Sequence, residues 1–233
     1  MPGYILLEGG AEFGGRMAEP DQRAIALAGG ANAPIHIIPA AAAPDHNHQR
    51  AGGHAKRWFH SLGASNVNVL HLIDAESAND SAIVEQLRTS RLIYMLGGFT
   101  HYLGTTLWES ASWQAMIEAY EAGAVIAGSS AGAMVLCEWY YNPESQQMFQ
   151  GLGLVSGACV LPHYDTFGHR WVQRIKTLLP HAALLGIDER TGMLNDGGAE
   201  TERLWCVYGH GTVTVHTYGQ AKTYVEGDVF LWS

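Results

Sequence analysis

Residues 124–136 read Ala124-Val-Ile-Ala-Gly-Ser-Ser-Ala-Gly-Ala-Met-Val-Leu136: an apolar run, a Gly-x-Ser-x-Gly pentapeptide and a second apolar run. This order predicts a buried strand, a sharp turn and a helix. The central residue of such a turn, Ser130, has a strained backbone, and small residues at Gly128 and Gly132 prevent a clash between strand and helix. The stretch therefore predicts a nucleophile elbow in an α/β fold.

The chemistry expected at this elbow belongs to Ser130. Its hydroxyl projects above the sheet, and the Ala131 N–H, at the start of the helix, can donate to a developing oxyanion. Ser129 is the neighbouring alternative, but it lacks the symmetrical glycines. A Gly/Ser-rich loop without chemistry, or an anion-binding turn, is the competing interpretation.

Alternating strand and helix patterns surround the elbow. Short apolar runs are typical of buried parallel strands, and apolar residues at a 3.6-residue period indicate helices between them. The predicted strands are Tyr4–Leu7, Ile35–Pro39, Val67–Ile73, Leu92–Leu96, Ala124–Ala127 and Cys159–Leu161. The predicted helix faces are Ala51, Ala55, Trp58, Phe59 and Leu62; then Ile83, Val84 and Leu87; then Trp113, Met116, Ile117 and Tyr120.

Repeated β-α units predict a doubly wound, mainly parallel sheet. Asp80 and Ser112 are expected to cap their helices, and Gly123 to follow the end of the third. From Leu204 onward, alternating runs separated by glycine-containing turns predict an antiparallel addition at the C-terminal end. A length of 233 residues fits one domain, 1–233.

Composition narrows the classes of function. The chain is 47% hydrophobic and 15% charged, which indicates an ordinary folded protein. A net charge of -9 without any Lys/Arg run argues against nucleic acid as a partner. We find no leader pattern and no apolar stretch of the roughly 20 residues that span a membrane. Three widely spaced cysteines fit a reducing compartment, so we expect a cytoplasmic protein without a membrane partner.

A serine nucleophile requires a base and a group that orients it. His163 directly follows an apolar strand, where it would face the same crevice as the elbow. Asp188 and Glu189 end another strand, and only one of them is expected to serve, because adjacent strand residues point to opposite faces. Gly97-Gly98 ends a fourth strand and can offer a second oxyanion donor.

A metal site is the second class of function considered. His46, His48, His54 and His60 lie within fifteen residues. Their spacing is irregular, and His54 and His60 are six positions apart on the predicted helix, so they do not share a face. A solvated histidine-rich loop is the simpler interpretation, and we predict no metal.

Four stretches together resemble the dipeptidase E and cyanophycinase family of serine peptidases, relatives of class I glutamine amidotransferases. They are Leu96-Gly97-Gly98, Gly128-Ser-Ser-Ala-Gly-Ala133, Pro162-His163-Tyr164 and Gly186-Ile-Asp-Glu-Arg-Thr191. The similarity runs in order from about Leu6 to the C-terminus. Each piece alone is a weak signal, whereas the combination is specific.

The resemblance implies a flavodoxin-like three-layer sandwich formed by a single class I glutamine amidotransferase-like peptidase domain. It implies Ser130 as nucleophile, His163 as base, and Gly98 with Ala131 as the oxyanion hole. Cyanophycinase-like members complete the triad with the Glu of the Gly-Ile-Asp-Glu segment, here Glu189. Dipeptidase E is described with an Asp in that role, which leaves Asp188 open. The expected reaction is hydrolysis of a small peptide or isopeptide without a cofactor.

Departures from the family concern specificity. Cyanophycinases follow the two glycines with an acid or amide and Gln, and place spaced arginines near the catalytic His. Here the first segment reads Gly98-Phe-Thr-His101, which argues against a cyanophycin substrate, and Arg170 and Arg174 are the nearby candidates for binding a substrate carboxylate. A catalytically silent amidotransferase-like binding module is the alternative function. A homodimer is compatible with the sequence.

Overall fold

A computed structural model describes residues 2–198, 204–217 and 219–232. Its larger sheet has the strand order β14-β11-β10-β1-β5-β4-β2-β3. Five neighbouring strands are parallel, in agreement with the prediction. They are β1 (Tyr4–Glu8), β2 (Ile35–Ile38), β3 (Val67–Val69), β4 (Leu92–Met95) and β5 (Val125–Ser129).

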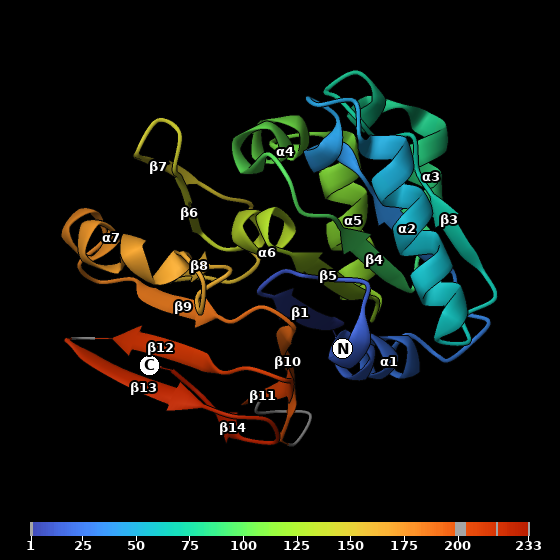
Figure 1. The fold of residues 1–233 in the computed structure, drawn as a ribbon. Coiled ribbons are helices and arrows are strands. Elements are labelled where there is room, and N and C mark those ends of the chain that lie inside the picture. The colour runs from blue at the N-terminus through green and yellow to red at the C-terminus, as the bar shows by residue number, and fades with distance from the viewer. Residues whose placement is uncertain (1, 199–203, 218, 233) are drawn as a thin grey trace.

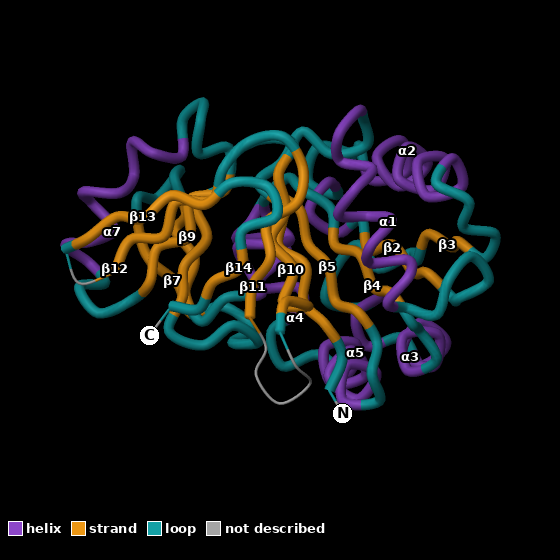
Figure 2. The backbone as a smooth tube through the Cα atoms, turned by 90° about the horizontal axis from the view of Figure 1, so that it is seen from below, coloured by secondary structure: helices purple, strands orange, loops and turns teal. Residues whose placement is uncertain are grey.

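Helices cover both faces of this sheet, as the two views show (Figures 1 and 2). Side chains alternate between the faces, so that Leu6 packs in one core and Leu7 in the other. The first face carries α1 (Ala18–Leu27) and α2 (His48–Ser61). The second carries α3 (Ser81–Arg88), α4 (Thr100–Leu107), α5 (Ala111–Glu121) and α6 (Ala131–Leu136).

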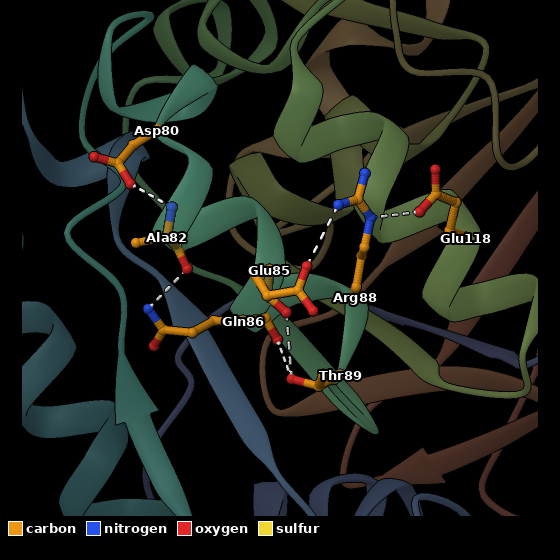
Figure 3. A network of polar contacts seen from close by, with 7 residues as sticks. All are labelled: Asp80, Ala82, Glu85, Gln86, Arg88, Thr89 and Glu118. Carbon is orange, nitrogen blue, oxygen red and sulfur yellow. Dashed lines mark hydrogen bonds and ion pairs between the residues drawn. The ribbon is translucent and has the colours of Figure 1, made fainter.

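Figure 3 shows polar contacts of α3: a cap at its N-terminus and an ion pair that joins it to α5 on the surface. The Asp80 carboxylate accepts hydrogen bonds from the N–H groups of Ala82 and Ile83, so the predicted cap of α3 is confirmed. Arg88 donates to Glu118 of α5 at 2.7 Å. The predicted cap of α5 was wrong by two residues: Ser110 accepts from the backbone, whereas Ser112 is buried within the helix.

The C-terminal part adds antiparallel strands to the sheet, as predicted. These are β10 (Thr191–Gly197), β11 (Leu204–Gly209) and β14 (Val229–Phe230), with β10 paired directly to β1. A second sheet has the order β13-β12-β9-β8. Its strands are β8 (Ala158–Leu161), β9 (Ala183–Ile187), β12 (Val213–Thr217) and β13 (Gln220–Tyr224).

The placement of β8 differs from the expectation of one doubly wound sheet. After α6 the chain forms a hairpin of β6 (Trp139–Asn142) and β7 (Gln147–Gln150), then enters β8, which pairs in parallel with β9. Helix α7 (Val172–Leu178) connects β8 to β9. The position beside β1 is occupied by β10 instead, so β8 lies outside the larger sheet.

The predicted strand Val67–Ile73 is also shorter in the structure. Only Val67–Val69 form β3, at the edge of the sheet, and the chain beyond it is not part of a strand. Leu70 and Leu72 are nevertheless buried, which explains the apolar pattern. Within the described residues, no helix combines the length and apolar character needed to cross a membrane.

Candidate active site

The elbow lies between β5 and α6, where the sequence placed it (Figure 1). Ser130 has φ 49° and ψ −108°, a conformation that L-residues rarely adopt. A Cβ on Gly128 would lie 2.3 Å from the backbone carbon of Gly132, and one on Gly132 would lie 2.3 Å from the Met95 carbonyl oxygen. The two glycines are therefore required by close backbone contacts with α6 and with β4.

A chain of hydrogen bonds links Ser130, His163 and Glu189. The Ser130 Oγ lies 3.1 Å from His163 Nε2, and His163 Nδ1 lies 2.8 Å from Glu189 Oε1. The side chains of His163 and Glu189 are 21% and 27% exposed, so solvent reaches the pair without separating it. With Nδ1 protonated toward the carboxylate, Nε2 is free to accept the serine proton.

Several contacts fix the imidazole of His163. Its backbone N–H donates to the Gly9 carbonyl at 2.7 Å, in the loop after β1. The ring stacks on Phe167 with centroids 4.9 Å apart. A Cβ on Gly10 would lie 2.3 Å from the ring, so this loop closes directly over it. The imidazole of His163 is therefore oriented by segments far apart in the sequence.

The two neighbouring carboxylates have different partners. Asp188 Oδ2 accepts hydrogen bonds of 2.8 Å from both the N–H and the hydroxyl of Thr212. Glu189 faces His163 instead, and its N–H donates to Asp165 at 3.0 Å. Of the two candidates that the sequence left open, Glu189 is therefore the one whose carboxylate contacts His163.

Two backbone N–H groups are available beside Ser130. The N–H groups of Gly98 and Ala131 donate to no acceptor within the described residues. Gly98 has φ +139°, and a Cβ there would lie 2.3 Å from the Ala41 carbonyl oxygen. The next N–H, of Phe99, donates to that carbonyl at 2.8 Å, so the loop is held in place.

The two arginines proposed for substrate binding lie apart from the Ser130–His163 contact. Arg174 donates to the Gln146 carbonyl in the turn between β6 and β7. Arg170 lies in the 3₁₀ helix Gly168–Trp171 with an exposed side chain. Neither guanidinium contacts Ser130, His163 or Glu189 within the described residues, so their role stays a prediction.

Sequence reasoning missed Glu12. Its carboxylate accepts a hydrogen bond from the Ser129 hydroxyl at 3.0 Å. A Cβ on Gly97 would lie 3.2 Å from both Glu12 Oε1 and Ser130 Cβ. Glu12 therefore lies beside Ser130, and its position just after Gly9-Gly10, at the end of a predicted strand, is the signal that could have found it.

A pair of fully buried acids also escaped sequence reasoning. Glu8 ends β1, and its carbonyl accepts the Ser130 N–H at 3.0 Å. Its carboxyl group accepts a hydrogen bond from Tyr94, and Asp21 accepts one from Trp58 at 2.7 Å. Burial, reinforced by the neighbouring Asp21 charge, raises the pKa of Glu8 well above its ordinary value. Burial likewise raises the pKa of Asp21 to about 7.

The histidine-rich segment gives no cluster of metal ligands. Among the residues that the structure describes, no group of three or more His, Cys, Asp or Glu side chains is placed to hold a metal ion. His48 has a ring contact with His71, at 6.2 Å between centroids. His60 Nδ1 lies 2.8 Å from the Ala64 carbonyl oxygen.

A sheet with helices on both faces and a serine at a strained strand-to-helix turn are features that α/β serine hydrolases share. The chain belongs to peptidase family S51, whose model matches residues 5–202. It is accordingly a serine-type peptidase, and the expected resemblance to the dipeptidase E and cyanophycinase family is confirmed.

Named relatives span most of the chain. The cyanophycinase of Geminocystis herdmanii (strain PCC 6308) is 29% identical, covering 95% of this chain and 83% of the relative. That of Nostoc sp. (strain PCC 7120 / SAG 25.82 / UTEX 2576) is 28% identical, covering 91% and 72%.

Solved structures match the fold. A peptidase from an acI-B1 Actinobacterium superposes with a TM-score of 0.86 at 27% identity, covering 100% of this chain and 98% of that one. A putative peptidase E from Listeria monocytogenes EGD-e has a TM-score of 0.64 at 19% identity, covering 91% and 100%, and supports the fold alone.

Proposed function

We propose that this peptidase hydrolyses a small peptide or isopeptide through a Ser130–His163–Glu189 triad and an acyl-enzyme. The observation that carries the proposal is the continuous hydrogen-bond chain from the serine hydroxyl through the imidazole to the carboxylate. Such a chain lets the imidazole take the serine proton while the carboxylate stabilises the imidazolium.

In the first half of the reaction, His163 Nε2 removes the hydroxyl proton as Ser130 Oγ attacks the carbonyl carbon. The N–H groups of Gly98 and Ala131 donate to the oxygen that becomes negative. The protonated His163 then gives its proton to the leaving amine, and the carbon–nitrogen bond breaks. In the second half, His163 activates a water, which hydrolyses the acyl-enzyme and restores the serine.

The first test uses a fluorophosphonate probe and mass spectrometry. We expect a single adduct on the unaltered protein, loss of the adduct in Ser130→Ala, and its retention in the matched control Ser129→Ala. A screen of Asp-Xaa and other dipeptides then measures turnover. An adduct that persists in Ser130→Ala would overturn the assignment, and absence of any adduct would favour a catalytically silent binding module.

The third member of the triad is tested by a pair of amide substitutions. The amide in Glu189→Gln keeps the size of the carboxylate but lacks the negative charge that stabilises the imidazolium. We therefore expect kcat to fall by on the order of 10³–10⁴-fold. Asp188→Asn alters the contact with Thr212, and we expect kcat to change by less than about tenfold. The assignment fails if Asp188→Asn has the larger effect on kcat while both variants remain folded by circular dichroism.

A further inference from the structure

A cleft of about 580 Å³ opens directly beyond Gly98. Its lining includes Phe99 and Tyr102, from the loop after β4 and from α4, together with Asn142 at the end of β6 and Glu144 in the turn that follows. Such a volume is typical of sites for small ligands. We call this space the Phe99 cleft.

Apolar and aromatic groups dominate the walls of the Phe99 cleft. The side chain of Phe99 is 40% exposed, so its ring is accessible to a ligand in the cleft. The Tyr102 hydroxyl donates to the Ile73 carbonyl at 2.9 Å, so its polar end is already bound. A neighbouring hollow of about 220 Å³, lined by Trp108 and Phe149, shares His101 with the cleft.

The charges at the Phe99 cleft disfavour an acidic ligand. No Lys or Arg is among its described lining residues, and the one carboxylate, Glu144, is exposed at the rim. A carboxylate that entered would lose hydration without gaining a cationic partner, and would meet a like charge. An apolar side chain would instead gain the contacts that water cannot provide.

Gly98 connects the Phe99 cleft to the proposed reaction centre. The Cβ position of Gly97 lies 3.2 Å from Ser130 Cβ, and Gly98 is itself a lining residue. A substrate carbonyl that accepts from the Gly98 N–H therefore belongs to a residue at the mouth of the cleft. The bond from Phe99 to Ala41 fixes the wall relative to that N–H.

We propose that the Phe99 cleft binds the side chain of the substrate residue whose carbonyl is attacked, and that it selects large apolar or aromatic side chains over acidic ones. This inference rests on the proposed function for its orientation. Cyanophycinases carry an acid or amide at the position of Phe99. The proposed selectivity is the expected consequence of the aromatic ring at this position.

Turnover of three dipeptides tests the selectivity. We expect kcat/KM for Phe-Ala to exceed that for Ala-Ala and for Asp-Ala by about tenfold or more, because each buried methylene contributes discrimination of roughly this order. Phe99→Ala should remove most of this preference through KM, and should lower kcat/KM for Phe-Ala more than kcat/KM for an acetyl ester. Glu144→Lys should raise kcat/KM for Asp-Ala. The control Leu178→Ala removes an equally exposed apolar side chain outside the cleft.

Binding to Ser130→Ala protein tests the Phe99 cleft without requiring turnover. Calorimetry should show tighter binding of Phe-Ala than of Asp-Ala, and the additional change Phe99→Ala should abolish the difference. Equal binding of the two peptides would overturn the inference. So would an equal loss of kcat/KM in Phe99→Ala for every substrate, the acetyl ester included. Failure of the proposed function alone would instead appear as absence of the Ser130 adduct with selective binding retained.

Discussion

At the scale of single residues, backbone strain gathers around Ser130. Eight of the described non-glycine residues have a positive φ angle, and four of them lie at the site or in the segments bonded to it: Ala11, Ser130, His163 and Arg190. Each such angle costs of order 1–3 kcal/mol, so the surrounding contacts must hold it. For Ser130 these contacts include the bond from its N–H to the Glu8 carbonyl.

Two substitutions of Ser130 separate the effect of backbone strain on stability from the effect of the hydroxyl on activity. Ser130→Gly and Ser130→Ala both remove the hydroxyl, and we expect both to be inactive. Glycine adopts the required φ and ψ without strain, so Ser130→Gly should be more stable than Ser130→Ala by about 1 kcal/mol after the entropy cost of glycine. Urea unfolding of the two variants measures the difference, and equal or reversed stabilities would contradict it.

At the scale of elements, one polar cluster ties together four segments beside the elbow. Glu8 of β1, Asp21 of α1, Tyr94 of β4 and Trp58 of α2 meet on one face of the sheet. If both acids are ionised, the buried oxygens Glu8 Oε1 and Asp21 Oδ1 accept no hydrogen bond within the described residues. A proton on one carboxyl, donated to the other, satisfies both atoms.

This pair makes stability depend on pH in a direction opposite to that of an ordinary salt bridge. Because the pKa of Asp21 is raised from 3.8 to about 7, the folded state holds a proton that the unfolded state has lost. Stability is therefore full below about pH 4 and falls as pH rises toward 7. We expect the unfolding free energy to fall by about 2 kcal/mol from about pH 5 to about pH 8.

Asp21→Asn should flatten this dependence, because the amide still accepts from Trp58 and can donate to Glu8 without titrating. The exposed acid Glu76 serves as the control, and Glu76→Gln should leave the slope unchanged. Denaturant melts at several pH values measure the slope. If Asp21→Asn keeps the slope of the unaltered protein, the two acids do not share a proton.

At the scale of the whole molecule, the sequence predicts what depends on local order and misses what depends on distant pairing. Gly128 to Gly132 determine a turn within five residues, and Asp80 caps its own helix, so both could be predicted. The pairing of β1 with β10 joins Leu6 to Leu194, and Ser129 bonds Glu12 across 117 positions. No local pattern encodes such contacts, which explains why Glu12 and the placement of β8 were missed.

The two sheets share one core, which predicts that residues 1–233 unfold as a single unit. Leu7 of the larger sheet and Leu185 of the second belong to the same buried cluster, and Arg190 donates to the Gly10 carbonyl between them. Leu185→Ala should cost about 2–5 kcal/mol, because it leaves a cavity in a fully buried position. Since the core is continuous, the loss should destabilise both sheets equally.

Urea unfolding, followed by circular dichroism and by amide exchange in β5 and β12, measures this coupling. Leu6→Ala is the matched control, because Leu6 is equally buried but lies on the other face of the larger sheet. In both variants, the urea midpoints measured in β5 and in β12 should fall together. A lower midpoint in β12 alone for Leu185→Ala would mean that the second sheet is a separate domain, and that Glu189 and His163 reach Ser130 across a domain boundary.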